Sequence, residues 1–270
     1  MISSAHRIRL ESRSGRHTTN TSGLCPGYGQ GNLIVLPNDA AVDFIDLCYR
    51  NPVFCPLLGQ TPVGNPREIN NKEIIHDEDF NITTDIPKYN IYEHGKLLST
   101  KLDITDEWCG NHIAFIIGCS FSFENALSKN GLKPKHTLSG SNVSMFRTNI
   151  LLNPAGIFKN CHAVVSMRPY KLKDIEKVRN ISRKFRKTHG EPIDWGYDAV
   201  ERLGIQDLNN PEYGDAIKID DDEIPIFWGC GVTPQVAVQQ VGAAISGKVM
   251  GHSPGHMLIL DIKDNEVINL

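Results

Sequence analysis

The sequence has no long apolar run, no closely spaced cysteine pair and little net charge. The formal net charge of its 270 residues is −3, which gives no reason to expect a nucleic acid or a membrane surface as a partner. No apolar stretch approaches the roughly 18 residues that a membrane-spanning helix requires. Seven cysteines without a Cys-x-x-Cys pair favour a reducing compartment over a disulfide framework. We therefore expect a cytoplasmic protein.

The start of the chain leaves a second compartment open. Segment 1–17 is basic and rich in serine, without an apolar signal-peptide core, and is weakly similar to a transit peptide. An ordinary N-terminal arm has the same composition. The cytoplasm is thus the expected location, with the mitochondrial matrix as the alternative.

The stretch 112–127 is the most informative one. Ile113 to Ile117 is a short, β-branched apolar run, typical of a strand that is buried on both faces. Gly118 permits a sharp turn, and a helix is expected from about Ser122. The turn between them, Cys119-Ser120, would face the helix N-terminus, where anions bind readily. The alternatives are a cysteine that fills the core and a serine that caps the helix.

A second junction of the same kind lies near the C-terminus. The pattern predicts a strand over 224–228, a turn over 229–235 and a helix over 236–244, with Cys230 and Thr233 in the turn. If both turns lie at the carboxyl edge of one sheet, they enclose a polar crevice.

Two predicted strands, 142–149 and 163–169, each carry one arginine, Arg147 and Arg168. The planar guanidinium suits a carboxylate substrate. An ion pair with a structural carboxylate is an equally good explanation for either residue. Both readings stay open at the level of sequence.

The pattern also predicts the domain organisation. Segment 171–187 is amphipathic, and the order helix, strand, strand, helix from 122 to 187 is typical of a small α+β unit. We expect an inserted two-layer α+β domain at 120–188. Residues 1–119 and 189–270 would then form a discontinuous α/β main domain, a three-layer sandwich around a mixed sheet.

His252 lies in the motif Gly251-His252-Ser253-Pro254-Gly255-His256. Pro254 and Gly255 prevent the helix that would align the two histidines on a metal, and no cysteine or carboxylate cluster joins them. We therefore expect no metal site, and interpret His252 as a general acid or base, or as a hydrogen-bonded turn residue.

Further short motifs run in unbroken order from about residue 20 to the C-terminus. They are Gly27-Tyr28 with Gln30 and Asn32-Leu33, Arg50-Asn51-Pro52 with Cys55-Pro56-Leu57-Leu58, Gly118 to Glu124, Asn142 with Met145 and Arg147-Thr148-Asn149, Pro154-Ala155-Gly156, Ser166 to Pro169, His189-Gly190, Cys230 to Gln235, and His252 with Pro254-Gly255. Together they resemble the D-glutamate cyclase family. The resemblance implies an α/β sandwich with an inserted α+β domain, and the conversion of D-glutamate to 5-oxo-D-proline and water.

This reaction needs no redox or electron-sink cofactor, and its substrate is a small carboxylate. Substrate contacts are expected from Arg147, Asn149, Arg168, Cys230 and Thr233, and catalysis from Cys119, Ser120, Glu124 and His252. A covalent role for Cys119 is a sharper variant. A dehydratase of another small hydroxy or amino acid, or a non-catalytic carboxylate-binding module, are the alternatives. Association into a homo-oligomer is left open.

The chain departs from the family pattern at two places. An Ile-Arg-Thr-Asp run is replaced by Ile82-Thr83-Thr84-Asp85, and the usual His and Gly-Asp pattern is altered over Asp194 to Asp198. If either position contacts the substrate, the specificity of this chain differs from that of its relatives. The resemblance therefore predicts the fold more firmly than the substrate.

Overall fold

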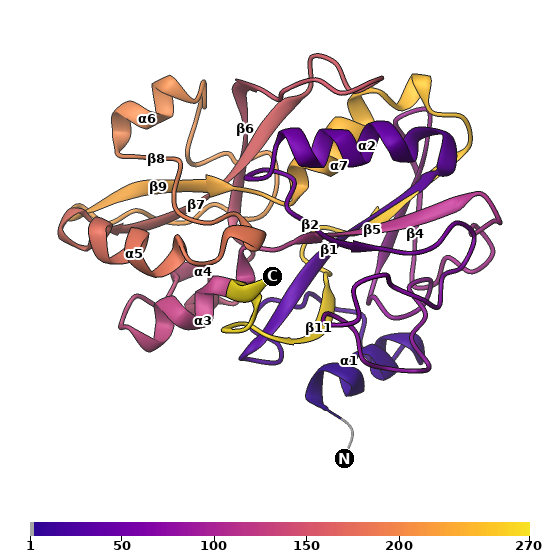
Figure 1. Cartoon of the computed structure of the whole chain (residues 1–270). Helices are drawn as coiled ribbons and strands as arrows, with labels where there is room; N and C mark the ends of the chain where they lie inside the picture. Colours follow the sequence, from indigo (N-terminus) through magenta and orange to yellow (C-terminus); the bar gives the residue numbers. More distant parts are fainter. Residues whose placement is uncertain (1–2) are drawn as a thin grey trace.

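The computed structural model describes residues 3–270 and contains two β-sheets joined at a corner (Figure 1). The larger sheet has the strand order β2-β5-β1-β10-β3-β4, with β11 also paired to β1, and the smaller has the order β6-β7-β9-β8. The strands are β1 (Tyr28–Pro37), β2 (Leu57–Gln60), β3 (Tyr89–Glu93), β4 (Lys96–Lys101), β5 (His112–Gly118), β6 (Ser144–Leu151), β7 (His162–Lys171), β8 (Asp194–Trp195), β9 (Glu223–Gly229), β10 (Lys248–His252) and β11 (Leu258–Lys263).

Helices cover both sheets. In Figure 1, α2 and α7 lie together over the larger sheet, and α3, α4 and α5 lie along the smaller one. The helices are α1 (Ser4–Arg13), α2 (Asn38–Arg50), α3 (Phe121–Lys129), α4 (Lys135–Ser139), α5 (Ile175–Ser182), α6 (Tyr197–Arg202) and α7 (Val232–Gln240), with short 3-10 turns η1 (Leu172–Asp174), η2 (Arg186–Thr188), η3 (Gly242–Ala244) and η4 (Val267–Asn269). Within residues 3–270, none of them is long and apolar enough to cross a membrane.

The α/β sandwich expected from the sequence is confirmed. One detail differs, because the paired strands of the described chain are antiparallel throughout, where a mixed sheet was expected. The successive strands that pair, β3 with β4 and β6 with β7, are joined without a long crossover, and such connections produce antiparallel neighbours.

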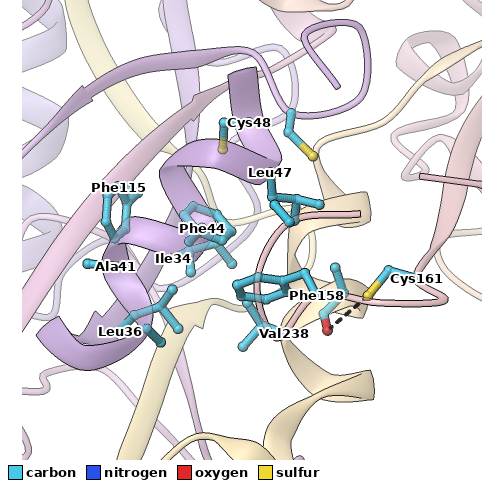
Figure 2. Close-up of a cluster of buried hydrophobic side chains, with 14 of the residues drawn as sticks. Ile34, Leu36, Ala41, Phe44, Leu47, Cys48, Phe115, Phe158, Cys161 and Val238 are labelled. Carbon is cyan, nitrogen blue, oxygen red and sulfur yellow. Dashed lines mark hydrogen bonds between the residues drawn. The ribbon is translucent and has the colours of Figure 1, made fainter. Parts of the chain in front are cut away.

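The strand predicted over 113–117 is buried on both faces, as expected. Alternate side chains of β5 point to opposite faces of the sheet: Phe115 joins the cluster under α2, whereas Ile116 packs on the other side with β11 and the segment 69–86. Figure 2 shows the first cluster, in which the ring of Phe44 from α2 lies 4.9 Å from that of Phe115 and 5.8 Å from that of Phe158. This core fixes the position at which β5 ends.

The strand predicted over 224–228 lies in a different sheet from the one expected. As β9, it pairs with β7 along seven residues, from Val165 opposite Gly229 to Lys171 opposite Glu223. The expectation that it shares a sheet with 113–117 is wrong, because this long antiparallel ladder satisfies its backbone groups next to β7. The smaller sheet thus takes strands from both sides of residue 188, and the boundary of the inserted unit, 120–188, stays a prediction.

The helix predicted over 171–187 is shorter than expected. Only Ile175–Ser182 is α-helical, flanked by the turns η1 and η2. Ile175 and Val178 pack with Phe123 of α3 and Trp228 of β9 on one face of the smaller sheet. The amphipathic face was therefore identified correctly, and its length was overestimated.

Candidate active site

The turn after β5 is shaped by close contact with a neighbouring segment. A Cβ atom at Gly118 would lie 1.8 Å from the carbonyl oxygen of Lys187, so only glycine fits there. Helix α3 begins three residues later at Phe121, and the side chain of its N-cap residue, Ser120, makes no capping hydrogen bond. The hydroxyl of Ser120 instead accepts a hydrogen bond from Arg168. The capping alternative for Ser120 is thus not observed.

Arg168, on β7, is fully buried, and its guanidinium is held by other side chains of the protein. Its Nε donates to Glu124 Oε1 at 2.9 Å, Nη1 to Ser166 Oγ at 3.0 Å, and Nη2 to Ser120 Oγ at 2.9 Å. The guanidinium also lies over the rings of Phe123 and Trp228. Arg168 therefore forms the buried ion pair that the sequence left open as one of two readings.

Arg168 and a histidine approach the same oxygen of Glu124. Nε2 of His136, at the start of α4, lies 3.2 Å from Glu124 Oε1, the same atom that Arg168 contacts. Burial alone would raise the pKa of Glu124, but His136 and Arg168 together lower it below its ordinary value. Glu124 is thus an ionised carboxylate that is only 6% exposed. Among the described residues, no donor contacts its other oxygen, Oε2.

A cavity of about 340 Å³ lies against Glu124. One wall is the loop from Gly23 to Tyr28, and another is α3 with the following segment, which brings Lys133 and Thr137 to the cavity. Asp264 lies on the rim, where Asn125 donates a hydrogen bond to it. The cavity is of a size suited to a small metabolite, and Glu124, whose Oε2 has no donor partner among the described residues, is one of its lining residues.

The histidine that completes this cluster, His136, was missed from the sequence. It is separated from Glu124 by twelve positions and a loop, and no motif marks it. Its ring stacks on Phe121, with 5.9 Å between centroids, and is almost fully buried. Only the packing of α4 against α3 brings it to the carboxylate.

The two cysteines of the turns, Cys119 and Cys230, are buried thiols. Burial raises the pKa of Cys119 to about 12 and that of Cys230 to about 11. Both therefore remain protonated at neutral pH. The geometry gives no support to a thiolate nucleophile, and Cys119 packs as the core residue that the sequence also allowed.

Asn32 of β1 bridges the two turns. Its Nδ2 donates to the carbonyl oxygen of Gly118 at 2.9 Å, and a Cβ atom at Gly231 would lie 2.0 Å from that same nitrogen. The two junctions are therefore neighbours, as predicted, although their strands belong to different sheets. Asn32 Oδ1 in turn lies 2.7 Å from Nε2 of His252.

The contacts of His252 determine its protonation. Gln235 Nε2 donates a hydrogen bond to the backbone carbonyl oxygen of His252, so this side-chain atom is the amide nitrogen. The same nitrogen lies 2.9 Å from His252 Nδ1 and therefore donates to it as well. Nε2 must then carry the proton that Asn32 Oδ1 accepts. Burial lowers the pKa of His252 to about 3. Both ring nitrogens of this neutral histidine are engaged, so the geometry favours the hydrogen-bonded turn residue over the general acid or base.

The remaining predicted contact residues lie apart from this cluster. The hydroxyl of Thr233 is buried between the backbone N–H and C=O of Val164 on β7. Arg147 is exposed on β6 and donates to the hydroxyl of Tyr213. Asn149 is also exposed, and its backbone N–H donates to Leu203. None of the three lines the cavity beside Glu124.

The positions that depart from the family pattern also lie outside this cavity. Thr83 is buried and donates a hydrogen bond to Asn81 Oδ1 at 2.8 Å. Asp194 accepts a hydrogen bond from Arg202 at 2.7 Å. Both residues therefore serve local structure in this chain.

The match to a family model agrees with the resemblance noted in the sequence. The family model described as D-glutamate cyclase matches residues 113–261, which contain Glu124, Arg168 and His252. A solved nitrogen repressor-like protein from Methanococcus jannaschii aligns over 97% of this chain and 98% of its own, with 13% identity and a TM-score of 0.39.

Curated relatives match nearly the whole chain. Proteins named "Putative hydro-lyase" from Bordetella petrii and Rubrobacter xylanophilus are 44% and 42% identical, each over 97% of this chain and 96% and 97% of their own lengths. A protein of the same name from Schizosaccharomyces pombe is 43% identical over 92% of this chain and 81% of its own. The chain therefore belongs to the D-glutamate cyclase family of hydro-lyases.

Proposed function

We propose that this protein removes water from a small amino-acid carboxylate bound in the cavity beside Glu124, and that the substrate is D-glutamate, converted to 5-oxo-D-proline. One observation carries the proposal: Glu124, a buried and ionised carboxylate whose Oε2 has no donor among the described residues, lines a cavity of metabolite size. Such a group binds an ammonium, and it can take a proton from the α-nitrogen as the C–N bond forms, because that nitrogen then becomes far more acidic.

The reaction balances without any further reactant. The α-nitrogen forms a bond to the γ-carboxyl carbon, and one C–O bond of that carboxyl breaks. Two protons of the ammonium leave on the departing oxygen as water, and the third stays on the lactam nitrogen. Glu124 Oε2 takes the first proton and returns it to the leaving oxygen.

The other cavity residues bind and orient the substrate. Lys133 is the cation on the cavity wall and pairs with the α-carboxylate, which neither arginine contacts in this proposal. Arg168 and His136 act through Glu124, because both lie against Oε1 and leave Oε2 without a donor. They are positioning residues, and Ser120 keeps the guanidinium in place.

The test is incubation of the purified protein with D-glutamate, L-glutamate and a pool of small hydroxy acids, followed by mass spectrometry for loss of water. We expect 5-oxo-D-proline from D-glutamate. Glu124→Gln should lower kcat/KM by about 10²- to 10⁴-fold, and Lys133→Gln should mainly raise KM. Glu176→Gln, an exposed change on α5, is the control and should match the wild type.

Three outcomes would contradict the proposal. Turnover of a hydroxy acid in place of D-glutamate would show that the proposed substrate is wrong, although the protein would still be a hydro-lyase. Full activity of Glu124→Gln would remove Glu124 from catalysis. Binding of a carboxylate without turnover of any compound would favour the non-catalytic binding module.

A further inference from the structure

A second, larger hollow of about 910 Å³ lies between the segment Arg183 to Ile193, the Pro52-Val53 loop and Ile268 near the C-terminus. It shares no lining residue with the cavity beside Glu124. The proposed lyase reaction makes no use of it.

The charges around this hollow are mainly positive. Arg183, Lys184 and Arg186 line it, with Glu191 as the carboxylate among them. Glu191 is already engaged, because its Oε2 lies 3.1 Å from Arg179 Nη2 and 3.4 Å from Arg183. Within the described chain, Lys184 and Arg186 have no carboxylate at ion-pair distance. In a protein whose net charge is −3, this concentration of unpaired cations favours an anionic ligand.

The remaining wall is apolar. Pro52, Val53, Pro192, Ile193 and Ile268 contribute to it. A site that held only an inorganic anion would have no use for such a surface. Apolar walls with a few converging charges are typical of sites for organic ligands, and a volume of about 300 to 1,000 Å³ is usual for them.

His189 supplies a buried polar group on the same wall. Its Nδ1 lies 2.8 Å from the carbonyl oxygen of Val53, which can only accept, so Nδ1 carries the proton. Nε2 is buried beside the backbone of Gly118 and, among residues 3–270, makes no hydrogen bond of good geometry. His189 is 1% exposed and has a left-handed backbone, φ +82°, a strained conformation for a residue other than glycine that is found preferentially at functional sites.

We propose that this hollow binds an organic anion that carries phosphate groups, of about nucleotide size. The phosphates contact Lys184 and Arg186, since guanidinium and ammonium groups match phosphate oxygens. The organic part lies on the wall of Pro52, Val53 and Ile193. Arg183 stays paired with Glu191 and closes the rim.

The hollow is connected through the backbone to the turn that carries Ser120. Arg186 begins the 3-10 turn η2, and the carbonyl oxygen of the next residue, Lys187, lies against Gly118. A ligand that holds Lys184 and Arg186 therefore also restrains the backbone against Gly118. Binding should raise the melting temperature as ligand concentration increases.

The test is isothermal titration calorimetry of the full chain with pyrophosphate and with ADP, in low salt and without substrate. We expect ADP to bind more tightly than pyrophosphate, because only ADP uses the apolar wall. The double variant Lys184→Gln, Arg186→Gln should weaken ADP binding by about tenfold or more, as expected for lost hydrogen bonds between charged groups. Lys173→Gln, an exposed change on η1 outside the hollow, is the control and should have no effect.

The proposal is overturned by no saturable ADP binding, by ADP binding no more tightly than pyrophosphate, or by equal weakening in the Lys173→Gln control, which would show diffuse surface attraction. Because the readout is binding in the absence of substrate, its failure is independent of the proposed lyase reaction. Circular dichroism of the variants confirms that they are folded.

Discussion

The junction at Gly118 and the junction at Gly229 look alike in sequence and differ in what their side chains do. Each runs from a buried strand through a Gly-Cys turn into a helix. After the first, Glu124 and Ser120 join a buried ion pair beside a cavity. After the second, Thr233 is hydrogen-bonded to β7 and Gln235 to His252.

The difference follows from the residues of the two helices. Helix α7 has the sequence VTPQVAVQQ, without an ionisable side chain, and seven of its nine residues are buried. Helix α3 carries Glu124 in its first turn, opposite Arg168 and His136. The strand, turn and helix are thus common to both junctions. Only the first becomes a candidate site, because Glu124 is charged and has partners on other elements.

The largest expected effect concerns the ion pair of the first junction. Arg168→Met leaves Glu124 buried with only His136 beside it, and should lower the free energy of unfolding by about 3 to 5 kcal/mol. The double variant Arg168→Met, Glu124→Gln removes the charge and should recover part of this loss in urea unfolding. Equal stability of the single and double variants would show that the buried charge of Glu124 does not need Arg168 for its stabilisation.

The second prediction concerns the histidines next to the junctions, His189 and His252, whose pKa values are lowered by burial to about 4 and about 3. As the pH falls below about 6.5, the unfolded chain binds protons first. The free energy of unfolding is therefore highest above about pH 6.5. It decreases toward pH 4, by roughly 3 kcal/mol for each histidine. Unfolding free energies at pH 7.5 and pH 4.5 measure the change.

His189→Asn is the matched variant for this pH dependence. Asparagine tolerates a positive φ, and its side-chain N–H can replace Nδ1–H at Val53. It has no group that titrates in this range, so the variant should lose about half of the acid destabilisation. An unchanged pH profile would mean that His189 is not the titrating group.

A smaller effect separates the two hydroxyls. Thr233→Val removes both hydrogen bonds to the backbone of Val164, and should lower stability by about 1 to 3 kcal/mol without changing kcat/KM of the folded enzyme. Ser120→Ala should do the reverse, with a smaller loss of stability and a clear loss of activity, because it removes one of the three side chains that position the guanidinium of Arg168. The comparison fails if Thr233→Val is the less active of the two.

The smallest effect is expected at the two cysteines. With pKa values of about 12 and about 11, Cys119 and Cys230 carry almost no thiolate at pH 7.5. The Cys119→Ser variant should therefore retain most of its activity. Iodoacetamide should label the exposed Cys109 first, as peptide mass spectrometry would show. Rapid labelling of Cys119, together with an inactive serine variant, would restore the covalent mechanism.

Local patterns in the sequence were sufficient for several elements. The run Ile113 to Ile117 predicted a strand buried on both faces, because alternate side chains must each find an apolar layer. The strands predicted over 163–169 and 224–228 also lie within β7 and β9. The α/β class and the family followed from the sequence, and Glu124 was among the residues named for catalysis.

The tertiary structure alone decided the partners. The apolar run of β9 is compatible with either sheet, and only the ladder to β7 shows which one it joins. Arg168 could have faced a substrate or a carboxylate, and its pairing depends on the docking of α3 against β7. His136 reaches Glu124 because α4 packs beside α3. Sequence periodicity reports which side of an element is buried, whereas pairing between distant elements depends on contacts that no local pattern encodes.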